Sequence, residues 1–208
     1  MKLTSLDVQT LTTLDVETSR GTARLHQAGH GEPLLVLGHG AGGGVGALDL
    51  VVAAQAALDL GWRVALVEQP WRLKGRKVAE PPPRLDEAWV DVLATLEGTP
   101  LVVGGRSAGA RVACRTAAQV GADAVLCLAF PLHPPGRPDR SRLPELELVD
   151  VPLLVVQGTQ DAFGVPAGAQ LIEGADHGFR VRKGLPAAGP QIAAAVSPWL
   201  AQIQAKRS

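Results

Sequence analysis

The feature that most constrains the fold of this sequence is the pentapeptide at 105–109, GRSAG, which lies between an apolar run and an alanine-rich stretch. The run at 101–103 predicts a buried strand, and the stretch to about residue 120 predicts a helix. A chain that passes from strand to helix through one serine turns so sharply that bulky neighbours would clash, which favours glycine two residues away on both sides. Such a turn raises the hydroxyl of Ser107 above the end of the sheet, the arrangement known as a nucleophile elbow.

Short apolar runs alternate with helical patterns through the rest of the chain. Residues 8–17 and 22–28 alternate polar and apolar side chains around a turn, which is typical of an antiparallel hairpin. The other expected strands are apolar runs at 34–37, 63–67, 101–103, 124–130, 152–156 and 170–172. Such strands, separated by helices, predict a mostly parallel central sheet with helices on both faces. We therefore expect an α/β fold in a single domain over residues 1–208.

Two of the expected helices carry features that the fold must accommodate. In the helix after the first central strand, four large apolar residues share one face, which we expect to be buried. These are Leu48, Val51, Val52 and Leu58. The last helix, at 187–205, contains Pro198, and we expect a kink or two separate pieces because proline lacks the N–H that a helix interior uses.

Composition and charge exclude several classes of protein. The 20 basic and 20 acidic side chains cancel, which removes the electrostatic argument for a nucleic acid or an anionic membrane as partner. No run of about 18 apolar residues is present, and residues 1–20 lack the apolar segment of a signal peptide. We therefore expect a cytoplasmic protein, in which Cys114 and Cys127 are buried free thiols rather than a disulfide.

The order of residues along the chain selects partners for the serine. A serine hydroxyl is a weak nucleophile and needs a base within hydrogen-bond reach. Around an elbow of this kind, the acid and then the histidine follow the nucleophile in sequence. Asp161 follows the second expected strand after the elbow, and His177 alone among the five histidines comes after it. We therefore expect Ser107 as nucleophile, His177 as base and Asp161 as the orienting acid, with Asp176 and Glu68 as alternative acids.

A glycine-rich loop at 38–44, GHGAGGG, follows the first central strand. It is similar to the HGGG-type loops that supply backbone N–H groups to an oxyanion hole. We expect the N–H of Ala41 or Gly42 to act there together with the N–H of Ala108. His39 is interpreted as a structural hydrogen-bonding residue rather than as a second base.

The same loop supports a different interpretation. Gly38, Gly40 and Gly43 fit the G-x-G-x-x-G pattern of dinucleotide-binding folds, and Glu68 ends the next expected strand as a ribose-binding acid would. This pattern predicts an NAD(P)-binding oxidoreductase. The hairpin and the elbow with its two partners argue against it, because a dinucleotide fold requires neither.

Side chains in the loops at the same edge of the sheet indicate the substrate only weakly. Aromatic residues that are candidates to line an acyl pocket are Trp71, His133, Phe163 and Phe179. Basic residues close to the site are Arg72, Lys74, Arg76, Lys77, Arg106 and Arg111. For the four in the loop at 72–77, a solvated loop is the simpler interpretation and an anionic substrate the alternative. For the two beside the elbow, ion pairs that brace the turn are sufficient.

With these residues assembled, the chain resembles the α/β-hydrolase superfamily over nearly its whole length, and most of all its small dienelactone-hydrolase-like branch. The resemblance is carried by HGAGGG at 39–44, GGRSAGAR at 104–111, FPLHPPGRP at 130–138, QGTQDAFG at 157–164 and GADHGF at 174–179. It implies an α/β-hydrolase fold, and the short region at 131–150 leaves no room for a cap domain. Dienelactone hydrolases proper use a cysteine nucleophile, so the serine here means that their named activity is not expected.

We therefore expect a carboxylesterase-like serine hydrolase that cleaves small ester or related acyl substrates through an acyl-enzyme formed on Ser107. Its partner is a small-molecule acyl substrate, and we expect no cofactor, no metal, no nucleic acid and no membrane. Because relatives in this branch serve in complexes and the site is open, a non-catalytic interaction module with the same fold is the alternative. An NAD(P)-binding oxidoreductase is the third hypothesis.

Overall fold

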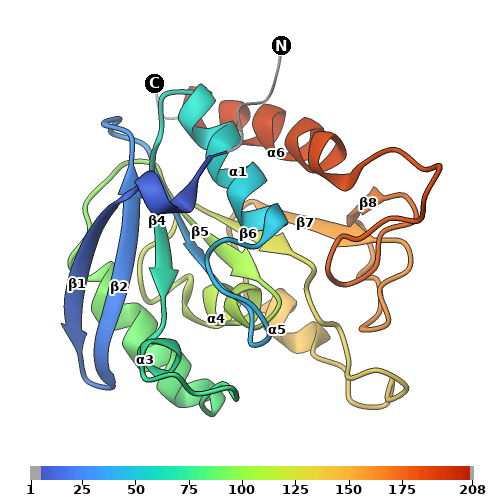
Figure 1. Cartoon of the computed structure of the whole chain (residues 1–208), viewed down its shortest axis with the longest axis horizontal. Helices are drawn as coiled ribbons and strands as arrows, with labels where there is room; N and C mark the ends of the chain where they lie inside the picture. The colour runs from blue at the N-terminus through green and yellow to red at the C-terminus, as the bar shows by residue number, and fades with distance from the viewer. Residues whose placement is uncertain (1–5, 207–208) are drawn as a thin grey trace.

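The computed structural model describes residues 6–206, and these form an eight-stranded sheet with helices on both sides (Figure 1). The strands are β1 (Thr12–Thr18), β2 (Gly21–Ala28), β3 (Leu34–Gly38), β4 (Arg63–Glu68), β5 (Leu101–Arg106), β6 (Ala124–Leu128), β7 (Leu153–Gly158) and β8 (Gln170–Ile172). Their order in the sheet is β1-β2-β4-β3-β5-β6-β7-β8. The single domain was expected over residues 1–208, and residues 1–5 and 207–208 of it lie outside the described part of the chain.

The sheet is antiparallel at its beginning and parallel elsewhere. Strands β1 and β2 form the expected hairpin, and β2 pairs antiparallel with β4. All other neighbours run parallel. Strands covered on both faces need apolar residues throughout, and every residue of β3 and β6 is buried. The mostly parallel sheet with an antiparallel start is therefore confirmed.

Helices cover both faces of this sheet. They are a 3₁₀ turn (Val8–Thr10), α1 (Leu48–Asp59), α2 (Pro70–Leu73), α3 (Pro82–Leu93), α4 (Ala108–Thr116), α5 (Leu143–Glu147) and α6 (Ala188–Ala205). Helices α1 and α6 pack together on one face, whereas α3 and α4 contribute to the core on the other (Figure 1). Between β6 and β7 the chain forms only loops and the short α5, so this region holds no cap domain.

The prediction of which face of α1 is buried is wrong. Leu48 is 49% exposed, and Val51, Val52 and Leu58 are only partly buried. The buried face is made of small residues together with Leu50 and Asp49, because close packing of a helix against the sheet and α6 favours alanine. The small buried residues are Ala53, Ala54, Ala56 and Ala57.

Smaller differences from the expected elements are found at two places. Val8–Thr10 is a 3₁₀ turn rather than the start of a strand. Helix α6 continues through Pro198 as one helix rather than as two separate pieces. Cys114 and Cys127 are buried free thiols, as expected, with their sulfur atoms 3.3 Å apart. No helix among residues 6–206 is long and apolar enough to cross a membrane.

Candidate active site

The elbow at Ser107 depends on close approach between two backbones. Ser107 joins β5 directly to α4 with φ 53° and ψ −109°, a conformation that a side chain tolerates poorly. A Cβ atom on Gly105 would lie 2.5 Å from the carbonyl oxygen of Gly38, and one on Gly109 would lie 2.3 Å from the same atom. Only glycine at these two positions allows the turn to rest against the end of β3.

Three side chains from separate loops form a hydrogen-bonded chain. Ser107 Oγ lies 3.0 Å from His177 Nε2, and His177 Nδ1 lies 2.8 Å from Asp161 Oδ2. Ser107 follows β5, Asp161 follows β7, and His177 lies in the loop after β8. The carboxyl ends of parallel strands meet at one edge of a sheet, which brings residues so distant in sequence together.

The surroundings of Asp161 determine the tautomer of His177. The buried carboxylate also accepts hydrogen bonds from Gln157 Nε2 at 2.7 Å and from the N–H of Phe163 at 2.8 Å. An ionised carboxylate only accepts hydrogen bonds, so His177 donates from Nδ1 and its Nε2 is free to accept the serine proton. Gln157 was not predicted from the sequence, although a polar residue in the otherwise apolar β7 was an available signal.

Within residues 6–206, neither alternative acid forms a hydrogen bond with the imidazole of His177. Asp176 Oδ1 accepts hydrogen bonds from the N–H groups of Gly178 and Arg180, and so shapes the turn that carries His177. Glu68 Oε2 lies 3.4 Å from His26 Nε2 instead.

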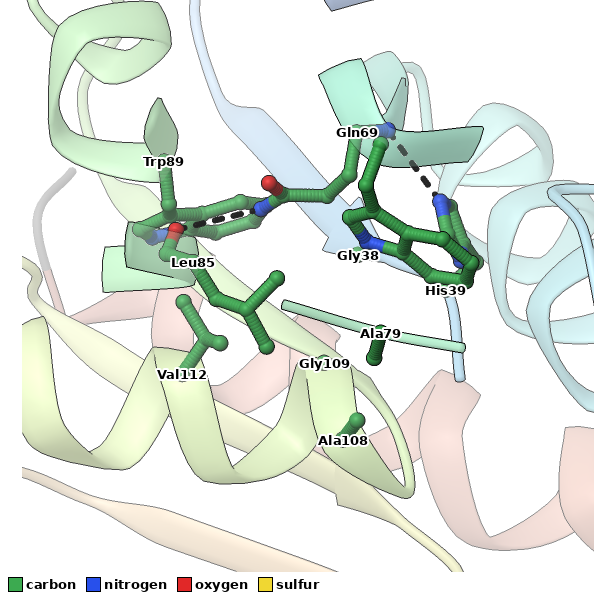
Figure 2. Close-up of a pocket in the computed structure, with 10 residues that line it drawn as sticks. Gly38, His39, Gln69, Ala79, Leu85, Trp89, Ala108, Gly109 and Val112 are labelled. Atoms are coloured by element: carbon green, nitrogen blue, oxygen red, sulfur yellow. Dashed lines mark hydrogen bonds between the residues drawn. The ribbon is translucent and has the colours of Figure 1, made fainter. Parts of the chain in front are cut away.

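The glycine-rich loop after β3 is held in place by His39. The N–H of Gln69 donates to His39 Nε2 at 3.1 Å, so the imidazole proton is on Nδ1, which donates to the carbonyl oxygen of Gly40 at 2.9 Å. Burial lowers the pKa of His39 and keeps the ring neutral. Figure 2 shows the Gln69 contact together with the hydrogen bond from its side chain to the carbonyl of Leu85.

This loop lacks the geometry of a dinucleotide fingerprint. In that motif the helix begins directly at the glycines, so that its N-terminus binds the pyrophosphate. Here α1 begins only at Leu48, well after Gly43. The loop instead contributes Ala41 and Gly42 to a cavity of about 540 Å³ beside Ser107 and Ala108.

Of the four aromatic candidates for an acyl pocket, only Phe163 lines this cavity, where its ring lies 4.1 Å from that of His177. Trp71 and Phe179 are 3% and 2% exposed, because both side chains turn into the core. Trp71 contacts the ring of His39 and borders a separate small cavity. His133 packs against Gly164 and does not line the cavity. The expectation for these three residues is therefore wrong.

Arg106 connects the parts of the site. Its guanidinium donates to the carbonyl oxygen of His177 at 2.7 Å and lies 3.1 Å from Asp49 Oδ2. Asp49 is buried at the start of α1, and its burial raises its pKa to about 6 although Arg106 opposes the shift. Arg106 was expected beside the elbow from the sequence. Asp49 was not predicted, because the burial of Asp49 depends on the orientation of α1.

The basic loop at 72–77 does not reach the cavity beside Ser107. Lys74 donates to the carbonyl oxygen of Arg20, and Arg76 pairs with Glu80. Arg76 and Lys77 line a different hollow in the surface.

Comparison with known proteins gives one family and many similar folds. A family model described as an alpha/beta hydrolase domain matches residues 31–197. An alpha-beta serine hydrolase homologue from Coxiella burnetii has a TM-score of 0.71 at 16% identity, with 91% of this chain and 97% of that chain covered. An a/b serine hydrolase without lid from Xanthomonas campestris has a TM-score of 0.66 at 18% identity, with 92% and 94% covered.

A dienelactone hydrolase from Anabaena variabilis is similar as well, with a TM-score of 0.71 at 17% identity and 92% of this chain and 97% of that chain covered. At such identities the similarity is one of fold. No curated protein matches the sequence.

Proposed function

Because the chain belongs to the alpha/beta hydrolase domain family, we propose that it is a serine hydrolase that cleaves small esters through an acyl-enzyme on Ser107. The observation that carries the proposal is the hydrogen-bonded chain from Ser107 through His177 to Asp161, with distances of 3.0 and 2.8 Å. These are the lengths that proton transfer in a catalytic triad requires.

In the first step, Ser107 Oγ attacks the carbonyl carbon of the ester while His177 Nε2 takes the hydroxyl proton. The imidazolium that forms is stabilised by Asp161, whose carboxylate is held in position by hydrogen bonds from Gln157 and Phe163. His177 then returns the proton to the leaving alcohol. A water molecule, activated by the same imidazole, releases the acid and restores the serine.

The negative charge that develops on the carbonyl oxygen needs donors that are already in place. The N–H of Ala108, in the first turn of α4, and an N–H of Ala41 or Gly42 border the cavity at Ser107. The N-terminus of α4 adds its positive dipole end at the same place. Loss of one such donor costs about 10²–10³-fold in rate.

A fluorophosphonate probe, which phosphonylates activated serines, tests this function. We expect stoichiometric labelling of the wild-type protein, no labelling of Ser107→Ala, and wild-type labelling of Ser141→Ala, which removes an exposed hydroxyl outside the cavity. Hydrolysis of 4-nitrophenyl acetate and butyrate is measured in parallel. Absence of labelling in the folded wild-type protein overturns the proposal and favours a non-catalytic module. Unchanged labelling of Ser107→Ala also overturns it, because another residue then reacts with the probe.

A further inference from the structure

The cavity beside Ser107 is bordered by four arginine residues, and these differ in how they are paired. Arg106 is used by Asp49 and by the carbonyl oxygen of His177. Arg111 makes two hydrogen bonds with Glu145, at 2.8 and 2.6 Å. These two guanidinium groups therefore brace the elbow and its neighbouring loops.

The other two, Arg142 and Arg180, form no ion pair with any carboxylate among residues 6–206. Arg142 is partly buried and donates one hydrogen bond, to the carbonyl oxygen of Pro131 at 2.9 Å. A guanidinium has five N–H donors, so most of those on Arg142 remain available. Burial and the nearby charge of Arg111 lower the pKa of Arg142, although the charge of Glu145 opposes the shift.

One acidic residue, Asp176, also borders the cavity. Its Oδ1 accepts hydrogen bonds from the backbone N–H groups of Gly178 and Arg180, so the carboxylate is engaged by the turn. No ion pair joins it to the Arg180 guanidinium in the described part of the chain. Two guanidinium groups and one carboxylate without an ion pair among residues 6–206 therefore border the cavity, so the net charge of these three groups is positive.

The two arginines come from different loops and border the space that also contains the nucleophile. Arg142 precedes α5, whereas Arg180 follows His177. A volume of about 540 Å³ accommodates an acyl group and a leaving group together. One ligand attached at Ser107 can therefore extend a polar end toward either guanidinium.

We propose that the substrate carries a carboxylate in addition to its ester, and that Arg142 and Arg180 bind this carboxylate. The inference rests on the proposed serine hydrolase function. Guanidinium groups bind carboxylates through paired, charge-assisted hydrogen bonds, so a neutral ester leaves the two arginines without a partner. Hydrogen bonds to charged groups of this kind change affinity by about 10–100-fold.

Matched esters test the inference and show which part of the substrate bears the carboxylate. The acyl pair is 4-nitrophenyl hemiadipate and 4-nitrophenyl hexanoate, which differ by the terminal carboxylate. The leaving-group pair is 4-acetoxybenzoate and its neutral methyl ester. We expect the wild-type protein to favour the anionic member of one pair at least about tenfold in kcat/KM. Added salt should reduce this preference, because it screens exposed charges.

The double variant Arg142→Gln/Arg180→Gln should lower the anionic-to-neutral ratio at least about tenfold. Arg182→Gln, which removes an exposed guanidinium outside the cavity, should leave the ratio unchanged. If the wild-type protein hydrolyses both members of both pairs equally well, the inference is wrong while the hydrolase function stands. An unchanged ratio in the double variant overturns it too. If no ester is hydrolysed and the fluorophosphonate does not react, both proposals fall.

Discussion

Gly109→Ala tests whether the contact between the elbow helix and the glycine-rich loop sets the geometry of catalysis. A Cβ atom at this position would lie 2.3 Å from the carbonyl oxygen and 2.5 Å from the carbonyl carbon of Gly38, and 2.9 Å from the carbonyl oxygen of His39. All three atoms belong to the backbone, so no side chain can rotate away. The end of β3 and the start of α4 have to separate instead.

The size of this separation follows from the distances. Real Cβ atoms essentially never approach such atoms closer than 3.0 Å, so the two backbones must move apart by about 0.7 Å. This movement carries Ala41 and Gly42 away from Ser107 and loosens the oxyanion hole. Because displacements of about 1 Å at a reacting centre cost about 10²-fold, we expect kcat to fall 10–100-fold. Overpacking should also lower the free energy of unfolding by about 1–3 kcal/mol.

The assay is steady-state hydrolysis of 4-nitrophenyl butyrate, with urea denaturation as the measure of stability. Gly46→Ala is the matched control, because it adds the same methyl group in the loop after β3, at a position where no heavy atom lies within 4 Å. It should retain wild-type kcat. A Gly109→Ala protein that keeps wild-type kcat would refute the reasoning, and so would an equal loss of activity in both variants.

Three further predictions concern the charged groups of the site. The folded-state pKa of Asp49, about 6, lies above its ordinary value of 3.8, so the free energy of unfolding should fall by about 3 kcal/mol as the pH rises from below 4 to above 6. Asp49→Asn should abolish this fall in urea denaturation measured at several pH values. Asp161→Asn should lower kcat about 10⁴-fold because His177 takes the wrong tautomer, and a smaller loss than tenfold would contradict the assigned role. Arg106→Met should lower kcat more than it raises KM, since it frees the carbonyl oxygen of His177, and Arg106→Lys should partly restore kcat.

The residues proposed for catalysis were accessible from the sequence because they depend on local backbone demands and on chain order. The glycines around Ser107 reflect a turn that packs tightly on itself and against the end of β3, and the five-residue pattern that results is visible in the sequence. The order of Ser107, Asp161 and His177 follows from parallel strands that all end at one edge of the sheet. The same continuous apolar runs predicted the parallel sheet, since strands covered on both faces are apolar throughout.

Only the tertiary structure decided where long or buried side chains point. Trp71, in α2, and Phe179, in the loop after β8, were expected to line a substrate pocket. Both side chains turn into the core instead, because burial of their large apolar surface is more favourable than exposure at the rim. Asp49 is buried because it lies on the face of α1 that packs into the core, which consists of Leu50 and four alanines.

The charge of the site was likewise a tertiary property. The sequence directed attention to the basic loop at 72–77, whereas the unpaired arginines at the cavity are Arg142 and Arg180. Whether a guanidinium is neutralised depends on which carboxylates the fold brings within reach, and these come from elements far away in sequence. The sequence by itself therefore determined the fold and the expected chemistry at Ser107, and the packing of distant elements decided which substrate charge the cavity favours.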